Sequence, residues 1–258
     1  MSYFTGIDIG STASKVVVLD EARMVDAFVL PTGWSSKETA AGVAQRLASQ
    51  GRPVDEDMRV VATGYGRVSV DYAAKTVTEI TCHGKGGFAL LGRDCTVVDI
   101  GGQDTKVITV EGGMASSFLM NDKCSAGTGK FLEIMANRLG VDLPELFALA
   151  EQGEPLAISS MCTVFAESEV ISHIGAGERR EDIAAGVVDS VVSKVAGLCA
   201  RHTIQGDVLL TGGLCDSAYL VQRLSQRLGA TVYTDPMGRY AGALGAALIA
   251  RGKRGREA

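Results

Sequence analysis

The chain contains the same short pattern twice: an apolar segment that includes Asp-Ile-Gly, a tight polar turn, and a second apolar segment that carries a lysine. Aligning Asp8 of the first copy with Asp99 of the second also pairs Lys15 with Lys106. Apolar runs on both sides of a glycine-containing turn predict a β-hairpin in each copy. Because such turns can hold phosphate groups, the repeat predicts a nucleotide held between two related half-domains.

The composition is typical of an α/β protein. Hydrophobic residues make up 46% of the 258 residues, aromatic residues only 5%, and there are 32 glycines. This mixture suits Val/Ile strands, Ala-rich helices and many tight turns. The formal net charge of −5 argues against nucleic acid as a partner. Basic residues are scattered except in one stretch, which we interpret as a solvated segment: Arg251, Lys253, Arg254 and Arg256.

No apolar run approaches the roughly 20 residues that cross a bilayer. The sequence runs directly into a predicted strand, without a charged leader or a cleavable apolar segment. We therefore expect no membrane association and a cytoplasmic location, where structural disulfides are rare. The cysteines are then core thiols, metal ligands or reactive groups, and they stand at positions 82, 95, 124, 162, 199 and 215.

The predicted elements alternate in a way that favours sheets covered by helices. Strands are predicted at 3–9, 14–20, 24–30, 58–63, 95–100, 104–110, 114–120, 207–211 and 231–233. Helices are predicted at 36–50, 125–139, 144–152, 164–175, 180–203, 216–228 and 238–251, with helical segments between 66 and 91. The repeat places the first half-domain at 1–92 and the second at 93–237, with the helix at about 238–251 packing back near the first.

The first turn supplies groups suited to phosphate. Gly10, Ser11 and Thr12 offer backbone amides and hydroxyls at close range, and Lys15 can add a cation. Gly101 and Gly102 occupy the corresponding turn of the second copy. The chain has no Walker A pattern and no G-x-G-x-x-G after a first strand, which excludes P-loop and Rossmann sites.

Four polar side chains at the two turns are candidates for catalysis. Asp8 and Asp99 end equivalent strands and can hold the water shell of a Mg²⁺ ion. Gln103 and Asp104 are candidates to orient an attacking water, since phosphoryl transfer depends on positioning and charge neutralisation. A third glycine turn, Gly212-Gly213, follows a predicted strand and can support an adenine or a ribose, although an ordinary strand–helix connection fits it equally well.

These residues resemble the ATPase superfamily of actin, Hsp70 and the sugar kinases. In that superfamily two ribonuclease-H-like halves each contribute a phosphate hairpin to a nucleotide cleft. The resemblance implies that Asp8 and Asp99 act at Mg²⁺ and that Gly212 and Gly213 lie at the adenosine of ATP or ADP. It also implies that the small-residue segment 241–247 connects the halves at a pivot, although a tightly packed helix without a hinge role is the alternative.

Cys124 and Cys162 each precede a predicted helix, whose N-terminal dipole favours a thiolate and an anionic cluster. Buried structural thiols are the alternative. The sequences around these cysteines resemble those of the activator components of 2-hydroxyacyl-CoA dehydratases. They are Asn-Asp-Lys-Cys at 121–124 and Cys-Thr-Val-Phe-Ala-Glu-Ser-Glu at 162–169. The activator components belong to the BadF/BadG/BcrA/BcrD ATPase family, together with ATPase subunits of benzoyl-CoA reductase. Segments 63–67 and 78–84 extend the resemblance.

The resemblance implies that Cys124 and Cys162 ligate one [4Fe-4S] cluster shared by a homodimer, because two ligands per chain from two chains make four. It also implies a cofactor-binding role for Gly127, Gly129 and Glu133. The remaining cysteines have no matching role and are expected in the core. Cys82 and His83 are adjacent, and adjacent residues on a helix face apart, so this pair is interpreted as structural.

The implied function is ATP-dependent donation of one electron to a 2-hydroxyacyl-CoA dehydratase-type partner, with a ferredoxin or flavodoxin as donor. Movement of the two half-domains is expected to reach the cluster through the helix predicted at 125–139. Three alternatives remain: a small-molecule kinase of the same superfamily that uses Asp104 as its carboxylate, a non-enzymatic nucleotide-dependent scaffold, and an ATP-dependent reductase of a double-cubane cluster protein.

Overall fold

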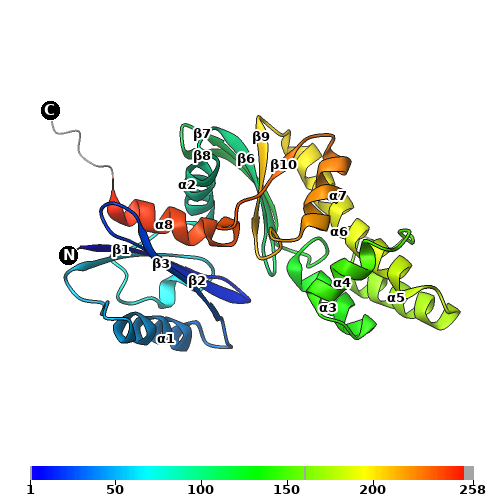
Figure 1. The fold of residues 1–258 in the computed structure, drawn as a ribbon, viewed down its shortest axis with the longest axis horizontal. Helices are drawn as coiled ribbons and strands as arrows, with labels where there is room; N and C mark the ends of the chain where they lie inside the picture. The colour runs from blue at the N-terminus through cyan, green and yellow to red at the C-terminus, as the bar shows by residue number, and fades with distance from the viewer. Residues whose placement is uncertain (1, 160, 253–258) are drawn as a thin grey trace. The chain divides into compact units, whose positions relative to one another are not determined.

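The protein forms two five-stranded sheets with the same order of strands, as seen in a computed structural model that describes residues 2–159 and 161–252 (Figure 1). The first sheet has the order β3-β2-β1-β4-β5, and the second, written from its other edge, has the order β8-β7-β6-β9-β10. The repeat aligns β1 with β6 and β2 with β7, so the two orders are equivalent. Lys253, Arg254 and Arg256 of the basic stretch lie outside the described residues.

Two compact units are separated by their internal contacts, and neither is one continuous segment. Unit 1 contains the residues up to Cys95, then Ile108–Ser117, and the residues from Met237 onward. Unit 2 contains Thr96–Val107 and Phe118–Pro236. Most of β7 and half of β8 therefore group with unit 1, which a single boundary near residue 93 did not anticipate.

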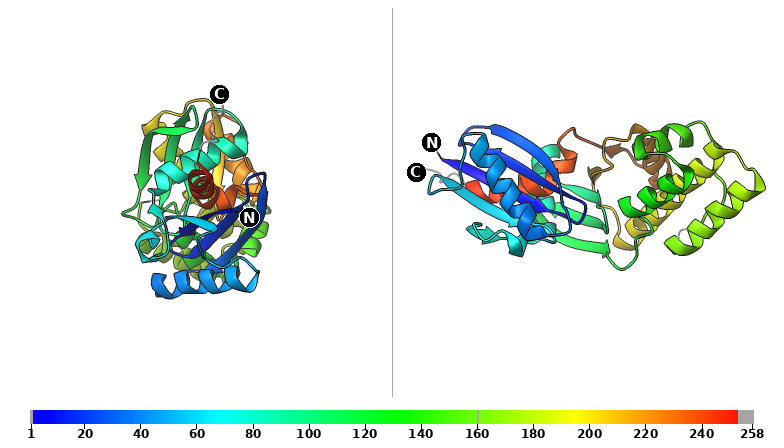
Figure 2. Two further views of the ribbon diagram at one scale, coloured as in Figure 1. Left: turned by 90° about the vertical axis from the view of Figure 1, so that its left-hand side faces the viewer. Right: turned by 90° about the horizontal axis from the view of Figure 1, so that it is seen from below.

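In unit 1, helices cover both faces of the first sheet. α1 packs its apolar residues against β1, β2 and β4 on one face, whereas α8 packs against Val17, Leu19 and Val61 on the other (Figure 2). The elements of this unit are β1 (Tyr3–Ile9), β2 (Ala13–Leu19), β3 (Met24–Pro31), α1 (Ser36–Ser49), β4 (Met58–Thr63), β5 (Lys75–Thr76), α2 (Glu79–Leu91) and α8 (Ala241–Arg251), with short 3₁₀ turns at Arg67–Ser69 and Gly238–Tyr240.

α8 approaches β1 and α2 so closely that only glycine fits at two of the contact positions. A Cβ on Gly6 of β1 would collide with the Ala243 carbonyl, and a Cβ on Gly245 would collide with the Cys82 carbonyl of α2. The small residues at 241–247 therefore serve tight packing, the alternative that the sequence left open. A pivot at this helix stays a prediction.

In unit 2, the part of the chain that runs from the end of β8 to the start of β9 forms a group of helices (Figure 1). The large apolar core of this unit lies between the second sheet and these helices, with Phe131, Leu132, Met135 and Leu146 fully buried. The elements of the second sheet and its helices are β6 (Cys95–Ile100), β7 (Thr105–Glu111), β8 (Met114–Asn121), α3 (Gly129–Leu139), α4 (Leu143–Ala150), α5 (Thr163–Ala176), α6 (Arg180–His202), β9 (Asp207–Gly212), α7 (Ala218–Leu228) and β10 (Val232–Tyr233).

Two predicted helices differ from the structure. The helical signal between 66 and 91 resolves into a 3₁₀ turn, the short strand β5 and only then α2. The helix predicted at 125–139 begins at Gly129, because Gly127 has a φ of 86° and breaks the helical path just before it.

α6 has 23 residues and a mean hydropathy of 1.6 over its most apolar window, so its length and composition alone would allow it to cross a membrane. In the structure 67% of that window is buried, against the core of unit 2. Its apolar residues are thus accounted for by packing within the protein.

Candidate functional site

The first turn carries exposed hydroxyl groups, and a partly exposed lysine lies on the strand that follows it. Asp8 on β1 lies opposite Lys15 on β2, and the Lys15 Nζ to Asp8 Oδ2 distance is 4.0 Å. Ser11 and Thr12, at the tip of the turn, are exposed. At this distance the ion pair is weak, and the Lys15 side chain keeps 18% of its surface exposed. The turn therefore combines exposed hydroxyls with a cation that can still take up an anion.

The second turn is built differently although its sequence is related. Lys106 Nζ lies 2.8 Å from Asp104 Oδ1 and 3.4 Å from Asp99 Oδ2, and its side chain is only 3% exposed. Thr211 on β9 donates a hydrogen bond of 2.9 Å to Asp99 Oδ1. A buried cation is tolerated only when it is paired and hydrogen-bonded. Lys106 therefore fixes two carboxylates, whereas Lys15, in the part of the chain that the structure describes, pairs with one carboxylate at a longer distance.

The third glycine turn lies directly against the second turn. Gly212 has a φ of 92°, and a Cβ at this position would come within 3.1 Å of Asp99 Oδ1. Only glycine fits both the backbone conformation and this approach. The structure thus brings together, within unit 2, Asp99 and Gly212, while Gly213 has open space around the position that a Cβ would occupy.

The two candidates for orienting water have unlike surroundings. Gln103 is exposed at the tip of the turn, whereas Asp104 is 4% exposed and paired with Lys106. A buried carboxylate that is paired with a lysine is poorly placed to contact an attacking water. Gln103 is therefore the better candidate of the two.

The loop after Cys124 is bonded directly to the second turn. The backbone amides of Gly129 and Lys130 donate to the carbonyls of Gly101 and Gly102, each at 2.9 Å. The hydroxyl of Thr105, the residue after Asp104, donates a buried hydrogen bond of 2.6 Å to the Gly127 carbonyl. Glu133, one turn into α3, pairs with Lys130 at 3.3 Å. The predicted residues Gly127, Gly129 and Glu133 thus lie on a later segment that is hydrogen-bonded to the turn region. The sequence analysis did not identify the contact made by Thr105.

The two candidate cluster ligands lie on adjacent loops of unit 2. The Cys124 thiol lies 3.7 Å from the Met161 carbonyl, and the hydroxyls of Ser125 and Thr163 are 2.8 Å apart. The first contact joins Cys124 itself to the residue before Cys162, and the second joins the residues that directly follow the two cysteines. Cys162 is the N-cap residue of α5, as predicted. Cys124 does not directly precede a helix, because α3 starts only at Gly129, so the dipole argument holds for Cys162 alone.

The two cysteines differ from the other four in accessibility. Cys124 and Cys162 are half-buried, whereas Cys82, Cys95, Cys199 and Cys215 are buried. Burial raises the pKa of Cys82 to about 12 and that of Cys199 to about 11, which keeps both thiols protonated at neutral pH. Within the described residues no group of three or more His, Cys, Asp or Glu side chains could hold a metal ion. Two accessible thiols from one chain fit half of a four-thiolate site.

Exposed apolar side chains surround the start of α5. Met161, Val164 and Phe165 are 76%, 66% and 62% exposed. Ile171 and Ile174 continue the exposed apolar residues along the same helix. We call these five residues the α5 apolar strip. Contiguous exposed apolar side chains are typical of surfaces that bind another protein.

A family model decides the classification: that of the BadF/BadG/BcrA/BcrD ATPase family matches residues 5–250. The chain belongs to this family. The (R)-2-hydroxyglutaryl-CoA dehydratase activating ATPase of Acidaminococcus fermentans is 44% identical over 254 residues, which cover 97% of this chain and 98% of that protein.

Solved structures agree with this membership. The crystal structure of component A of the A. fermentans dehydratase matches with a TM-score of 0.91, at 44% identity over 97% of this chain and 98% of that one. The activator of the 2-hydroxyisocaproyl-CoA dehydratase from Clostridium difficile with bound ADPNP matches with a TM-score of 0.89, at 38% identity over 96% of this chain and 94% of that one.

The fold extends beyond the family. A glucokinase of the ROK family from Streptomyces griseus matches with a TM-score of 0.59 at 16% identity, over 97% of this chain and 99% of that one, which reflects the fold alone. The two sheets of equivalent order are the two ribonuclease-H-like halves of an actin-like ATPase, as the sequence predicted.

Proposed function

We propose that this member of the BadF/BadG/BcrA/BcrD ATPase family is an ATP-dependent one-electron donor that activates a 2-hydroxyacyl-CoA dehydratase-type enzyme in the cytoplasm. The observation that carries the proposal is the direct bonding of the Cys124 loop to the second phosphate turn, beside the loop of Cys162. Relatives of similar length are named as ATPases or activators of such dehydratases, and one of their structures contains an ATP analogue.

In this proposal, ATP binds at the turns of both units. Ser11, Thr12 and Lys15 take up phosphate oxygens, because they are exposed or only weakly paired. Asp8 and Asp99 are the candidates to hold a hydrated Mg²⁺, which prefers a few carboxylates and retains waters. Gln103 orients the water that attacks the terminal phosphate.

The remaining predicted glycines support the nucleotide through the backbone. Gly10, Gly101 and Gly102 shape the two phosphate turns, and Gly212 and Gly213 receive the adenosine. Gly127 and Gly129 are hydrogen-bonded to Thr105 and to the second turn, and Glu133 lies one turn further along α3.

Cys124 and Cys162 are proposed to hold one [4Fe-4S] cluster together with the same two residues of a second copy. When bound, such a cluster supplies a one-electron carrier. The chain itself holds the two thiols on adjacent loops through the Met161 carbonyl and the Ser125–Thr163 hydroxyl pair. The α5 apolar strip next to Cys162 offers the surface on which the two copies meet.

The bound nucleotide is proposed to influence the cysteines through hydrogen bonds made by the second turn. Any shift of Gly101, Gly102 or Thr105 acts on the loop of Cys124, because all three are hydrogen-bonded to it or to the start of α3. A nucleotide can bias partner docking only if the ATP and ADP forms differ in conformation. The electron donor in this proposal is a ferredoxin or flavodoxin, and the acceptor is the dehydratase-type partner.

The test is anaerobic purification followed by measurement of iron, acid-labile sulfide and native mass on one sample. The proposal expects about four irons per two chains and their loss on exposure to air. The Cys124→Ser variant should lose the iron and still bind ATP, while Cys215→Ala, a matched change at a buried thiol, should keep it.

Full iron content in Cys124→Ser would refute the ligand assignment. An iron-free monomer that transfers phosphate from ATP to a small molecule would favour the kinase alternative instead.

A further inference from the structure

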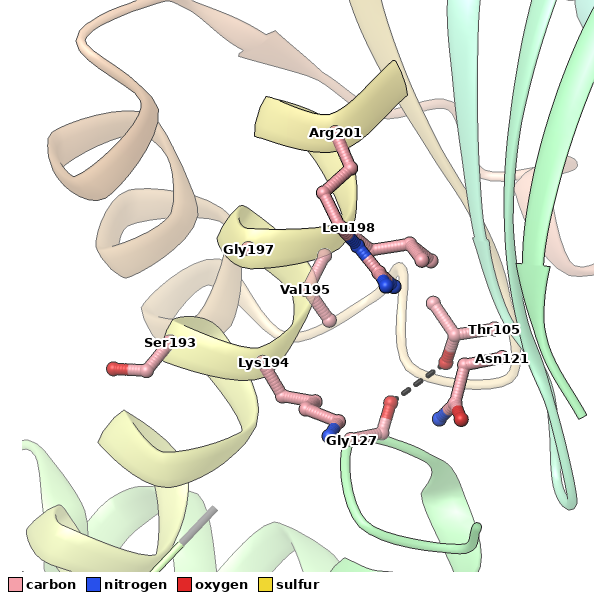
Figure 3. Close-up of a pocket in the computed structure, with 9 residues that line it drawn as sticks. All are labelled: Thr105, Asn121, Gly127, Ser193, Lys194, Val195, Gly197, Leu198 and Arg201. Atoms are coloured by element: carbon pink, nitrogen blue, oxygen red, sulfur yellow. Dashed lines mark hydrogen bonds between the residues drawn. The ribbon is translucent and has the colours of Figure 1, made fainter. Parts of the chain in front are cut away.

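A second site lies in unit 2, in a cavity of about 330 Å³ between α6 and the residues around Gly127 (Figure 3). Thr105, Asn121 and Gly127 line one side, and Val195 and Leu198 of α6 line the other. Its volume is at the lower end of the range for small-molecule sites. It shares Gly127 with the residues proposed for the nucleotide, but neither Gly10–Thr12 nor Gly212-Gly213 lines it, so it is a separate cavity beside that site.

Two cations of α6 line the cavity. The side chains of Lys194 and Arg201 extend from the helix toward Gly127 and toward Thr105 and Asn121 (Figure 3). They are seven residues apart, so they lie on one side of the helix about two turns apart. Among the described residues neither makes an ion pair or a side-chain hydrogen bond, and no carboxylate lines the cavity.

This contrasts with three other basic residues of the same unit. Arg223 and Arg227 of α7 both bind Asp189, and Lys106 is held by two carboxylates. Two unpaired cations that share one cavity attract an anion, and the planar fork of arginine suits a carboxylate or a phosphate. The apolar side chains of Val195 and Leu198 between them suit a short carbon chain.

We propose that this cavity binds a small organic dianion, with one anionic group at Arg201 and the other at Lys194. Dicarboxylates and phosphorylated carboxylic acids share this chemistry. The bound ligand also restrains the Cys124 loop. The stem of Lys194 packs against Gly127, and the Asn121 amide nitrogen donates to the carbonyls of Cys124 and Ala126, each at 3.0 Å.

Equilibrium dialysis of the cluster-free protein with radiolabelled succinate and with 3-phosphoglycerate tests the binding and separates the two kinds of dianion. At low ionic strength one molecule of at least one of them should bind per chain, and added salt should weaken the binding. Lys194→Met and Arg201→Met should each raise the Kd roughly tenfold, since a charged hydrogen bond is lost. Arg179→Met, which removes one positive charge at the other end of α6, should leave it unchanged.

Absence of binding by both anions, or equal Kd values for Arg201→Met and Arg179→Met, would overturn the proposal. The loop restraint has its own readout, the rate at which iodoacetamide alkylates Cys124 in the same cluster-free protein. The bound anion should slow this rate in the wild type and leave it unchanged in Arg201→Met. An unchanged rate in the wild type at saturation overturns the restraint. None of these measurements depends on iron, so their failure is distinguishable from failure of the proposed electron transfer.

Discussion

Lys15 and Lys106 occupy equivalent positions of the repeat, but the side chains around them differ. Lys106 neutralises two buried carboxylates, whereas Lys15 faces one carboxylate at 4.0 Å and remains partly exposed. The difference comes from the turn, where Asp104 of the second copy stands opposite Ala13 of the first. Lys106 is thus committed to buried ion pairs, and we propose Lys15 as the lysine that contacts phosphate.

Replacing each lysine by methionine separates these roles. Lys106→Met should lower the free energy of unfolding by roughly 3–5 kcal/mol, because two buried carboxylates lose their partner. Lys15→Met should change it by less than about 1 kcal/mol and should weaken ATP binding instead. Urea denaturation and equilibrium ATP binding measure the two effects. Equal losses of stability in both variants would show that burial does not distinguish the lysines.

The thiols should also separate by reactivity. In folded, cluster-free protein at pH 8, iodoacetamide should modify Cys124 and Cys162 before it modifies Cys82 and Cys199. Burial shields the latter two and raises their pKa values to about 12 and 11, so at pH 8 nearly all of each stays in the unreactive protonated form. Peptide mass spectrometry after timed quenching gives the order, and modification of Cys82 ahead of Cys124 would contradict it.

At this scale the sequence identified Asp8 with Asp99 and Lys15 with Lys106 as equivalent positions, because the repeat aligns them, but it did not predict that each lysine pairs with the aspartate of its own hairpin. It could not predict that Thr211 binds Asp99 or that Thr105 binds Gly127, because these contacts join residues from separate strands and loops. The sequence does show a threonine directly after the turn. It does not show which later segment of the chain packs beside that threonine, so its hydrogen-bond partner could not be predicted.

Among the elements, the start of α3 is one place where the sequence prediction was wrong. Residues 125–128 were predicted to be helical, but the positive φ of Gly127 and its bond to Thr105 hold them as a loop. The amides that begin α3 are occupied by the carbonyls of Gly101 and Gly102. α5, by contrast, begins at Thr163, one residue before the predicted start at 164, and its contact with Ser125 is made by the Thr163 side chain and leaves the helical backbone intact.

The Thr105 bond predicts a measurable coupling. In wild-type cluster-free protein the alkylation rate of Cys124 should differ between saturating ADP and a non-hydrolysable ATP analogue. Thr105→Val should remove most of that difference while ATP still binds. Thr96→Val is the matched control, because the Thr96 hydroxyl donates a similar hydrogen bond of 2.8 Å to Gln205 elsewhere in unit 2. A control variant that loses the difference to the same extent would argue against a specific route.

The packing of α8 predicts opposite effects for the same substitution in two helices. Gly245→Ala should destabilise the protein by about 1–3 kcal/mol, because its Cβ would overlap the Cys82 carbonyl of α2. Gly42→Ala in α1 should instead stabilise it by roughly 0.5–1 kcal/mol, since nothing lies within 4 Å of its Cβ. Thermal unfolding of both variants measures the sign, and a stabilising Gly245→Ala would disprove the close approach.

At the scale of the whole molecule, the α5 apolar strip bears on assembly. Phe165→Ser should shift the native mass from dimer to monomer and lower the iron content in parallel, because the exposed apolar ring no longer contributes to the proposed contact. Val68→Ser is the control, since Val68 is 79% exposed in unit 1 and is not part of the strip. Native mass spectrometry under anaerobic conditions makes the comparison, and an unchanged dimer in Phe165→Ser would place the contact elsewhere.

The duplicated architecture was predictable from sequence because the repeat carries the order of strands as well as the turns. The division into units was less predictable. A single boundary near residue 93 agrees with the first crossing of the chain at Cys95, but Ile108–Ser117 groups with unit 1. Hydrophobic periodicity marks these residues as strands, and it does not reveal with which core they share contacts.

The discontinuity of unit 1 has a consequence for how the protein is made. α8 covers one face of the first sheet, yet it is synthesised roughly 230 residues after β1, an interval on the order of 10–50 s at ordinary rates of translation. During that time Val17, Leu19 and Val61 lack their apolar cover. We therefore expect the nascent chain to expose this apolar sheet face through most of its synthesis, a surface of the kind that chaperones bind.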